Sequence, residues 1–370
     1  MRPDDAMRRA LELARRGIGL TRPNPPVGAV LVKASRVVGE GWHRAAGRPH
    51  AEIEAIRHAG PRARGADLFV TLEPCSTHGR TPPCTEAIAR AGIRRVWAAV
   101  RDPNPRHRGR GLRQLAGQGI EVHEGLCADE ARAILAPFAH RILNGRPRVA
   151  LKMACTLDGR IADADGNSRW ISGPASRARV QELRRASDAI LIGSRTACAD
   201  NPRLTPRPAR GRAPWRVLVD STGRTPPAAA VFTADAGRTI VAVTHRCPIR
   251  RRSAFEATGA RCWVFAPDAS GRVPLEPLLR RLSDECHVMQ LLCEGGGALA
   301  GSLLREGRVD ELHWIIAPRW LGDGATPAVS GAQASISDTR PFRVLSAERM
   351  GTDVWMVMVP RAGNRRSPKT

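Results

Sequence analysis

One histidine and two cysteines constrain the fold of this chain more than any other feature, because together they have the pattern of a metal site. These residues are His50, Cys75 and Cys84, and Glu52 follows the histidine by two positions. Imidazole nitrogen and thiolate sulfur are ligands that zinc prefers, and three protein ligands leave one tetrahedral position for water. A carboxylate beside that position can act as a general base. The pattern therefore predicts a catalytic zinc centre.

The sequence around these residues agrees with this interpretation. His50 begins a run with helical character, residues 68–72 are typical of a short buried strand, and residues 85–92 predict a helix closed by glycine. Cys84 then lies at a helix N-terminus, where the helix dipole lowers the pKa of a thiol. A single histidine or cysteine is usually an ordinary core or surface residue. The zinc prediction therefore depends on the joint spacing of ligands and base.

The H-x-E motif followed by two Pro-Cys pairs resembles the zinc-dependent nucleoside and nucleobase deaminases. The eight-residue spacer 76–83 is longer than the two residues of that general signature, and it resembles the bifunctional riboflavin-biosynthesis deaminase-reductases. Residues 23–28 upstream and 102–105 downstream extend the resemblance. Thr77 departs from the family pattern, in which we expect histidine. Asn24 is either a substrate contact or a turn-forming residue.

A glycine run, residues 295–297, lies between an apolar segment at 288–293 and a helical run from Ala298 to Arg305. Glycine before a helix lets backbone N–H groups approach a phosphate. The spacing is not G-x-G-x-x-G, so a Rossmann fingerprint is not indicated. On the glycines alone, a phosphate site and a tight strand–helix turn both remain open.

The second half of the chain resembles the reductase half of the same bifunctional enzymes, which has a dihydrofolate-reductase-like sheet and uses NADPH. The resemblance is carried by residues 151–152, 157–159, 168–171, 200–207 and 294–296. Arg195 departs from it, because a small residue is expected there. With the first half, the resemblance covers about residues 7–359.

The resemblance implies an α/β protein with two domains. Residues 1–145 would form a cytidine-deaminase-like three-layer α/β/α domain, and residues 146–360 a dihydrofolate-reductase-like α/β domain. Alternating strands and helices in both halves favour such layered folds. The turn-rich residues 144–147 mark the boundary, and the polar residues 361–370 are expected to be disordered.

The resemblance also implies the roles of individual residues. In the first half His50, Cys75 and Cys84 would bind zinc, and Glu52 would be catalytic. In the reductase the substrate would contact Ser168, Arg184, Leu204, Arg207 and Glu294. The cofactor would contact Ala154, Trp170, Thr196, Asp200, Ser221, Gly296, Gly297, Ala298, Leu299, Ala300, Gly301 and Ser302. Arg184 and Arg207 suit a phosphate, because a planar guanidinium binds two oxygens at once. Either Lys152 or Asp200 could supply the proton for reduction.

Two consecutive reactions follow from the resemblance. The first is zinc-dependent hydrolytic deamination of a phosphorylated diaminopyrimidinone ribosylamine, and the second is NADPH-dependent reduction of its ribose to a ribityl chain. The implied partners are this small phosphorylated substrate and further copies of the chain, joined through the reductase half.

Composition raises one alternative, a nucleic-acid-editing deaminase, because the net charge is +24. Three observations argue against nucleic acid as a partner. Lysine occurs only at Lys33, Lys152 and Lys369, which suggests a general bias towards arginine. The arginines are spread over both halves, and aromatic residues make up only 4%, with no tyrosine to stack on bases. An editing deaminase also leaves the second half unexplained.

A second alternative is a structural zinc protein without turnover. Glu52 argues against it, because structural sites fill all four positions with protein ligands. No apolar run of about 18 residues predicts a membrane span. The nine cysteines are scattered and odd in number, so we expect free thiols and a cytoplasmic protein.

Overall fold

The structure is a computed structural model that describes residues 1–78, 82–209, 211–233, 235–331, 335 and 341–361. The chain forms two compact units. The first comprises Met1–Arg146 with His287–Met289, and the second comprises Pro147–Cys286 with Gln290–Thr370. Except for Arg361, the tail expected to be disordered lies outside the described residues.

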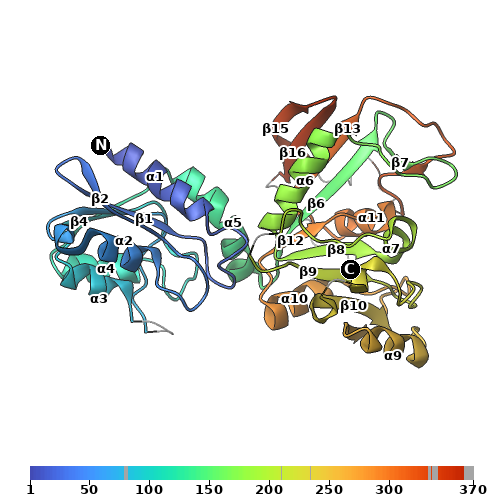
Figure 1. The fold of residues 1–370 in the computed structure, drawn as a ribbon, viewed down its shortest axis with the longest axis horizontal. Helices are drawn as coiled ribbons and strands as arrows, with labels where there is room; N and C mark the ends of the chain where they lie inside the picture. Colours follow the sequence, from blue (N-terminus) through green and yellow to red (C-terminus); the bar gives the residue numbers. More distant parts are fainter. Residues whose placement is uncertain (79–81, 210, 234, 332–334, 336–340, 362–370) are drawn as a thin grey trace. The chain divides into compact units, whose positions relative to one another are not determined.

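A five-stranded sheet with the order β2-β1-β3-β4-β5 forms the centre of the first unit (Figure 1). Strand β1 is antiparallel to β2 and β3, whereas β3, β4 and β5 are parallel. The strands are β1 (Gly28–Lys33), β2 (Arg36–Trp42), β3 (Asp67–Val70), β4 (Arg95–Ala98) and β5 (Glu121–Glu124).

Helices cover both faces of this sheet, because side chains alternate along the strands. Leu68 and Val70 of β3 pack with one set of helices, and Phe69 packs with the other. The first set is α2 (Ala51–Ala59), α3 (Cys84–Arg90) and α4 (Arg110–Gly117), and the second is α1 (Pro3–Arg15) and α5 (Ala128–Asn144). The expected three-layer α/β/α fold is confirmed.

Glycine lets the helix that carries Glu52 lie directly on the sheet. A Cβ atom at Gly41 of β2 would come within 2.3 Å of the Ala51 carbonyl oxygen. A Cβ atom at Gly39 would come equally close, 2.3 Å, to the carbonyl oxygen of Ala55. Any larger residue would therefore push α2, and the residues at its start, away from the sheet.

The second unit contains a nine-stranded sheet with the order β11-β10-β9-β8-β12-β6-β13-β16-β15. Strands β11 to β13 in this order are parallel, and the β15–β16 hairpin adds an antiparallel edge. The strands are β6 (Arg148–Thr156), β8 (Ala189–Gly193), β9 (Trp215–Val219), β10 (Thr239–Thr244), β11 (Arg261–Phe265), β12 (Gln290–Cys293), β13 (Glu311–Ala317), β15 (Phe342–Met350) and β16 (Asp353–Pro360). Strands β7 (Arg160–Ala162) and β14 (Thr326–Pro327) form a separate pair.

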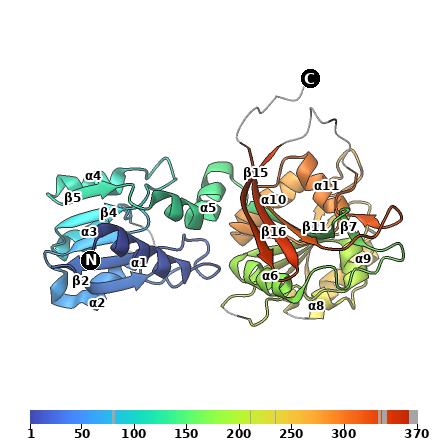
Figure 2. The ribbon, with the colours of Figure 1, turned by 90° about the horizontal axis from the view of Figure 1, so that it is seen from above.

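Helices also lie on both sides of this sheet. Figure 2 shows α10 and α11 on one side and α6 and α8 on the other. The helices are α6 (Pro174–Ala186), α7 (Ser194–Asp200), α8 (Ala230–Thr233), α9 (Ile249–Ala257), α10 (Leu275–Cys286) and α11 (Gly297–Arg305). Ligands of open parallel sheets bind beyond the carboxyl ends of the strands, so that edge is where a site is expected.

One strand begins later than the sequence suggested. The apolar run from Val288 predicts a strand, but β12 begins at Gln290, where pairing with Arg148 of β6 starts. Val288 and Met289 instead belong to the first unit. Among the described residues, no helix has the length and apolar character needed to cross a membrane.

Candidate functional sites

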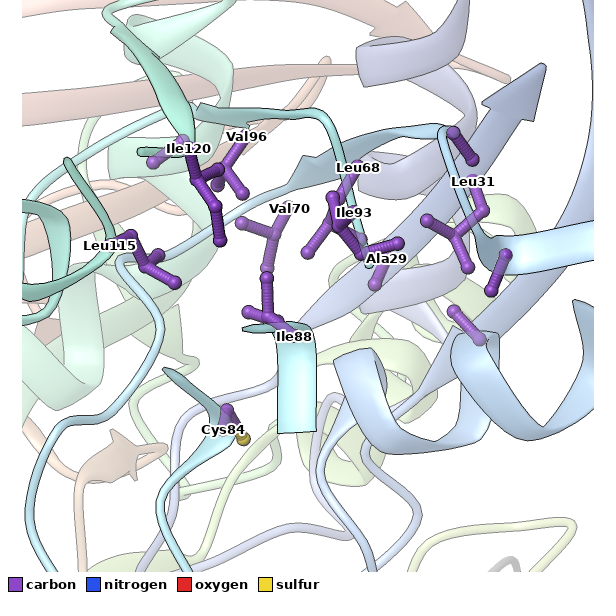
Figure 3. Packing of buried hydrophobic residues seen from close by; sticks show 14 of the residues in the cluster. Ala29, Leu31, Leu68, Val70, Cys84, Ile88, Ile93, Val96, Leu115 and Ile120 are labelled. Carbon is purple, nitrogen blue, oxygen red and sulfur yellow. The ribbon is translucent and has the colours of Figure 1, made fainter. Parts of the chain in front are cut away.

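The three residues expected to bind metal converge at one edge of the first unit. His50 is the N-cap of α2, Cys75 lies in the loop after β3, and Cys84 is the first residue of α3. Their ligand atoms all lie within 4.8 Å of one another. Within the described part of the chain, no other residue joins this group of possible metal ligands. In Figure 3, Cys84 lies at the start of α3, and Ile88 of the same helix packs against Val70 in the core.

The distances within this group fit zinc. His50 Nδ1 lies 3.3 Å from Cys84 Sγ and 3.6 Å from Cys75 Sγ. Tetrahedral zinc, with bonds of about 2.0 Å to nitrogen and 2.3 Å to sulfur, places its ligand atoms at about such separations. The backbone N–H of Cys84 donates to Cys75 Sγ at 3.3 Å. The hydrogen bond between the two cysteine side chains lowers the pKa of Cys75 and, together with burial, raises the pKa of Cys84, so the pair favours one thiolate, at Cys75.

Glu52 lies in the first turn of α2 and is only 4% exposed. Burial raises the pKa of its carboxyl group to about 7, and the charge of His50 opposes that rise. A carboxyl group that titrates near neutral pH can both accept and donate a proton.

His43 was not singled out from the sequence, yet it connects two site segments. Its Nδ1 lies 3.0 Å from the Pro49 carbonyl oxygen, and its Nε2 lies 3.1 Å from Asn24 Nδ2. A carbonyl oxygen only accepts, so Nδ1 carries the proton and Nε2 accepts from Asn24. The His43 ring also packs edge-on against His50, with ring centroids 5.3 Å apart. The residue pattern gave no signal for these contacts, because they join segments far apart in sequence.

Glu73 is a second residue that the sequence did not reveal. Its buried carboxylate accepts backbone N–H groups of Asp102 at 3.0 Å, Gly109 at 2.8 Å and Gly111 at 2.9 Å. Gly111 is required there, since a Cβ atom would lie 2.0 Å from the carbonyl oxygen of Pro74. Glu73 therefore fixes the loop after β4 directly behind Cys75. Thr77 lies in the described part of the spacer, whereas residues 79–81 lie outside it.

A cavity of about 1260 Å³ lies at the carboxyl ends of the parallel strands of the second unit. Most of the residues expected to bind substrate or cofactor line it. These are Ala154, Ser168, Trp170, Arg184, Thr196, Asp200, Leu204, Arg207, Ser221, Glu294, Gly296, Gly297, Ala298, Leu299 and Ser302. Ala300 and Gly301 are buried and do not appear among the lining residues.

The glycine segment serves packing as well as the cavity. Gly296 has a φ of 71°, and a Cβ atom there would lie 3.0 Å from Thr196 Oγ1. A Cβ atom would lie 2.5 Å from the Pro327 carbonyl oxygen at Gly297, and 2.1 Å from that of Ser330 at Gly301. Both glycines let the chain that contains Pro327 pass close to α11. At Gly296 the bare backbone faces the cavity, which leaves room for an anionic group at the helix N-terminus.

Arg184 and Glu294, both expected to contact substrate, bind each other. Arg184 Nε and Nη2 donate to the two Glu294 oxygens at 2.5 and 2.7 Å, and both side chains are largely buried. A bidentate pair of this kind holds each group in one orientation. Arg207 is exposed at the cavity wall, so it is better placed than Arg184 to meet a phosphate.

Polar residues of the cavity are held by further contacts. Ser168 Oγ donates to Asp200 Oδ1 at 2.8 Å. Burial lowers the pKa of Lys152, and the carboxylate of Glu294 opposes this effect. The Trp170 side chain is 62% exposed, with the Arg177 guanidinium 4.5 Å from the centre of its ring. Arg195 also lines the cavity beside Thr196.

Two family models match the sequence. The cytidine and deoxycytidylate deaminase zinc-binding region matches residues 2–100, and the RibD C-terminal domain matches residues 147–356. Curated relatives match both halves together. The riboflavin biosynthesis protein RibD of Bacillus amyloliquefaciens is 39% identical over 360 residues, covering 96% of each chain. That of Escherichia coli (strain K12) is 40% identical over 374 residues, covering 97% of this chain and 100% of the relative.

Solved structures resemble the whole chain as well. RibD of Acinetobacter baumannii, form 1, is 36% identical with a TM-score of 0.88, covering 97% of this chain and 99% of that one. A Thermotoga maritima protein, also 36% identical, gives a TM-score of 0.85 with the same coverage of 97% and 99%. It is described as a diaminohydroxyphosphoribosylaminopyrimidine deaminase and 5-amino-6-(5-phosphoribosylamino)uracil reductase.

Proposed function

Because the chain belongs to the RibD family of bifunctional riboflavin-biosynthesis enzymes, we propose that His50, Cys75 and Cys84 hold its zinc and that Glu52 is its catalytic acid–base. The protein is an enzyme of riboflavin biosynthesis with deaminase and reductase activities. The observation that carries the residue assignment is the convergence of one imidazole, two sulfurs and a buried carboxyl group, from segments that α2, β3 and α3 bring together.

The substrates proposed for this chain are those in the description of the Thermotoga maritima relative. The deaminase would act on a 2,5-diaminopyrimidinone that carries a ribosylamino 5′-phosphate. The reductase would then convert the ribose of the deaminated product into a ribityl chain. The unit limits Met1–Arg146 and Pro147–Cys286 support assigning residues 1–145 to the deaminase and 146–360 to the reductase.

In the deaminase, zinc supplies Lewis acidity and lowers the pKa of a water to about 7. Glu52 accepts the proton of the attacking water and donates a proton to the leaving amine. Its pKa of about 7 suits both steps, because the group is neither fully ionised nor fully protonated at neutral pH. His43 keeps the amide of Asn24 in one orientation, which supports a role for Asn24 in contacting the pyrimidine ring.

In the reductase, NADPH supplies the hydride. We assign the proton to Lys152, which donates it to the sugar oxygen as the ribose ring opens. Lys152 lies on β6 next to β12, where Leu151 pairs with Cys293, the residue before Glu294. Burial lowers the pKa of its ammonium group, which makes proton release easier. Asp200 is less suited to this role, because its Oδ1 is already occupied by a hydrogen bond from Ser168.

We also propose that copies of the chain associate through the reductase unit. Support comes from the edge strand β15, where Val344 and Leu345 are exposed together with Val354 of β16. An exposed edge strand with apolar side chains is a surface that proteins usually cover. Light scattering coupled to size exclusion tests this. A monomer at micromolar concentration contradicts it.

The Glu52→Gln variant tests the deaminase assignment. The amide keeps the size of the side chain but cannot carry the proton, so ammonia release should fall by roughly 10²- to 10⁴-fold. Zinc content should stay at the wild-type level, and NADPH oxidation on deaminated substrate should continue. Glu54→Gln is the matched control, because Glu54 lies on the same helix and binds Arg57 at its surface. Normal ammonia release by Glu52→Gln contradicts the role of Glu52.

A further inference from the structure

Among the arginines that line the reductase cavity, three come from segments that follow neighbouring strands. They are Arg224, Arg246 and Arg272, and all three are exposed. Each follows a different strand of the parallel sheet, namely β9, β10 and β11. These strands are neighbours, so the three arginines gather at one end of the cavity. That end therefore presents concentrated positive charge to a ligand.

The backbone N–H of each arginine donates to a nearby side chain, which for Arg246 is the Thr244 hydroxyl at 3.3 Å. The N–H of Arg224 donates to Asp220 Oδ1 at 2.9 Å, and that of Arg272 donates to Asp268 Oδ1, also at 2.9 Å. The guanidinium group of Arg246 packs against the loop that carries Arg272, since a Cβ atom at Gly271 would lie 2.4 Å from Arg246 Nη1. The cluster is thus formed by two adjoining loops and the turn after β9.

Two carboxylates, Asp220 and Asp268, also belong to the cavity lining, but each accepts hydrogen bonds from the backbone beside it. Asp220 is 1% exposed, and its two oxygens accept the N–H groups of Arg224 and Thr225. Asp268 Oδ1 accepts from Ser270 and Arg272. A site for NAD presents a carboxylate to the ribose 2′-hydroxyl, whereas a site for NADP places arginine there. Here the two carboxylates are engaged by backbone N–H groups, and three exposed arginines lie beside them in the same lining.

The position of the arginine cluster along the sheet distinguishes between a phosphate of the cofactor and the phosphate of the substrate. The residues that would meet the substrate, Lys152 and Glu294, lie on β6 and directly after β12. From β6 to β10 the sheet takes four strand-to-strand steps, about 19 Å at roughly 4.8 Å each. A dinucleotide with its nicotinamide beside Lys152 and its diphosphate at Gly296 spans that distance. The smaller substrate does not.

We propose that Arg224, Arg246 and Arg272 bind the 2′-phosphate of the cofactor's adenosine and thereby make the reductase select NADPH over NADH. This inference rests on the proposed NADPH-dependent reduction and adds the residues that decide the cofactor. The chemistry recognised is a phosphate monoester dianion, bound by exposed guanidinium groups in charge-assisted hydrogen bonds.

The test uses the full-length enzyme with zinc and the deaminated substrate. For Arg246→Ala and Arg272→Ala, the KM for NADPH should rise by roughly 10- to 100-fold each, with kcat nearly unchanged. The KM for NADH should hardly change, so the preference for NADPH falls by the same factor. Arg246→Lys, which keeps the charge, should lose less than the alanine variant. In binding titrations, the alanine variants should have a lower affinity than the wild type for 2′,5′-ADP and an unchanged affinity for 5′-AMP.

Arg250→Ala is the control, because this exposed arginine lies on α9 and outside the cavity lining. An unchanged KM for NADPH in the Arg246→Ala/Arg272→Ala double variant overturns the inference. A rise in the KM for the pyrimidine substrate instead assigns the cluster to the substrate's 5′-phosphate and overturns it as well. A wild-type enzyme that oxidises no NADPH contradicts the proposed reductase, a result separate from any effect of the arginines.

Discussion

The candidate sites of the two units are formed in different ways. In the first, three ligand side chains from short, recognisable motifs converge within 4.8 Å, and the chemistry depends on where a few donor atoms lie. In the second, a cavity of about 1260 Å³ is lined by residues from segments that follow many strands. The activity of a compact metal centre should therefore depend on each ligand atom. In an extended cleft, the binding free energy of the cofactor is distributed over many residues.

This contrast implies that the loss of one zinc ligand should abolish nearly all deaminase activity. Cys84→Ala removes one of three ligands, so zinc content should fall and ammonia release should drop by about 10³-fold or more. Metal analysis and an ammonia assay measure both effects. Cys198→Ala, at an exposed cysteine of the second unit, should change neither. Full zinc occupancy in Cys84→Ala would show that the ligand set is wrong.

The buried pair in the reductase cavity shows where the second unit is also sensitive. Glu294→Ala leaves the Arg184 guanidinium buried without its partner, so the unfolding free energy should fall by about 3 kcal/mol, and NADPH oxidation should be lost. Denaturant unfolding measures the change. Glu348→Ala breaks an exposed arginine pair in the same unit and should cost far less, because water screens an exposed pair. Equal losses of unfolding free energy in Glu294→Ala and Glu348→Ala would contradict the distinction between a buried and an exposed pair.

At the amino-terminal ends of β6 and β13, the second unit has an electrostatic network that should make its stability depend on pH. Glu311 accepts from His313 Nε2 at 2.7 Å and pairs with Arg148 at 2.6 Å, and Trp355 donates to His313 Nδ1 at 3.2 Å. Burial opposes ionisation, yet these partners lower the pKa of Glu311 to about 2. A carboxyl group whose pKa is depressed in the folded state stabilises the fold at pH values above its unfolded pKa of about 4.5. This contribution is lost as the pH falls towards about 2.

Glu311→Gln should therefore lower the unfolding free energy by about 2 kcal/mol at neutral pH, with a difference that shrinks between about pH 4.5 and 2. Urea unfolding at several pH values measures it, with Glu348→Gln as the exposed control. A difference that does not depend on pH in this window refutes the ionic contribution of Glu311.

The smallest effect is expected from a residue behind the metal ligands. Glu73→Gln replaces one acceptor oxygen with an amide group that cannot accept a backbone N–H, so the loop after β4 should shift slightly. Ammonia release should fall about 10-fold, as is typical for residues that support a metal site, while zinc remains bound. Glu130→Gln, exposed on α5, serves as the control. Unchanged turnover would mean that this loop does not position the site.

The sequence predicted much of the first unit because its signals are local. Motifs around His50, Cys75 and Cys84 lie at element boundaries that glycine, proline and apolar runs mark clearly. Contacts between distant segments could not be predicted, such as Glu73 with Gly109 or Asn24 with His43. In the second unit, the pairing of Arg184 with Glu294 joins residues 110 positions apart. No local pattern indicates whether such an arginine binds a ligand or a carboxylate.

Parts of the second unit were not predicted from the sequence. They include the β15–β16 hairpin, in which β15 is largely exposed and lacks the regular alternation of a half-buried strand. Arg246 and Arg272 appeared as ordinary surface charges until the sheet order placed them side by side. Topology, which a single sequence does not encode locally, decides these features.

One measurement tests the independence of the two sites most directly. Wild-type enzyme is stripped of zinc with a chelator, and two rates are followed: ammonia release from the diamino substrate, and NADPH oxidation with substrate already deaminated. The first rate should be lost and should return with added zinc, while the second stays at its original value. Loss of both rates on chelation, with the fold intact by circular dichroism, would contradict two separate catalytic centres.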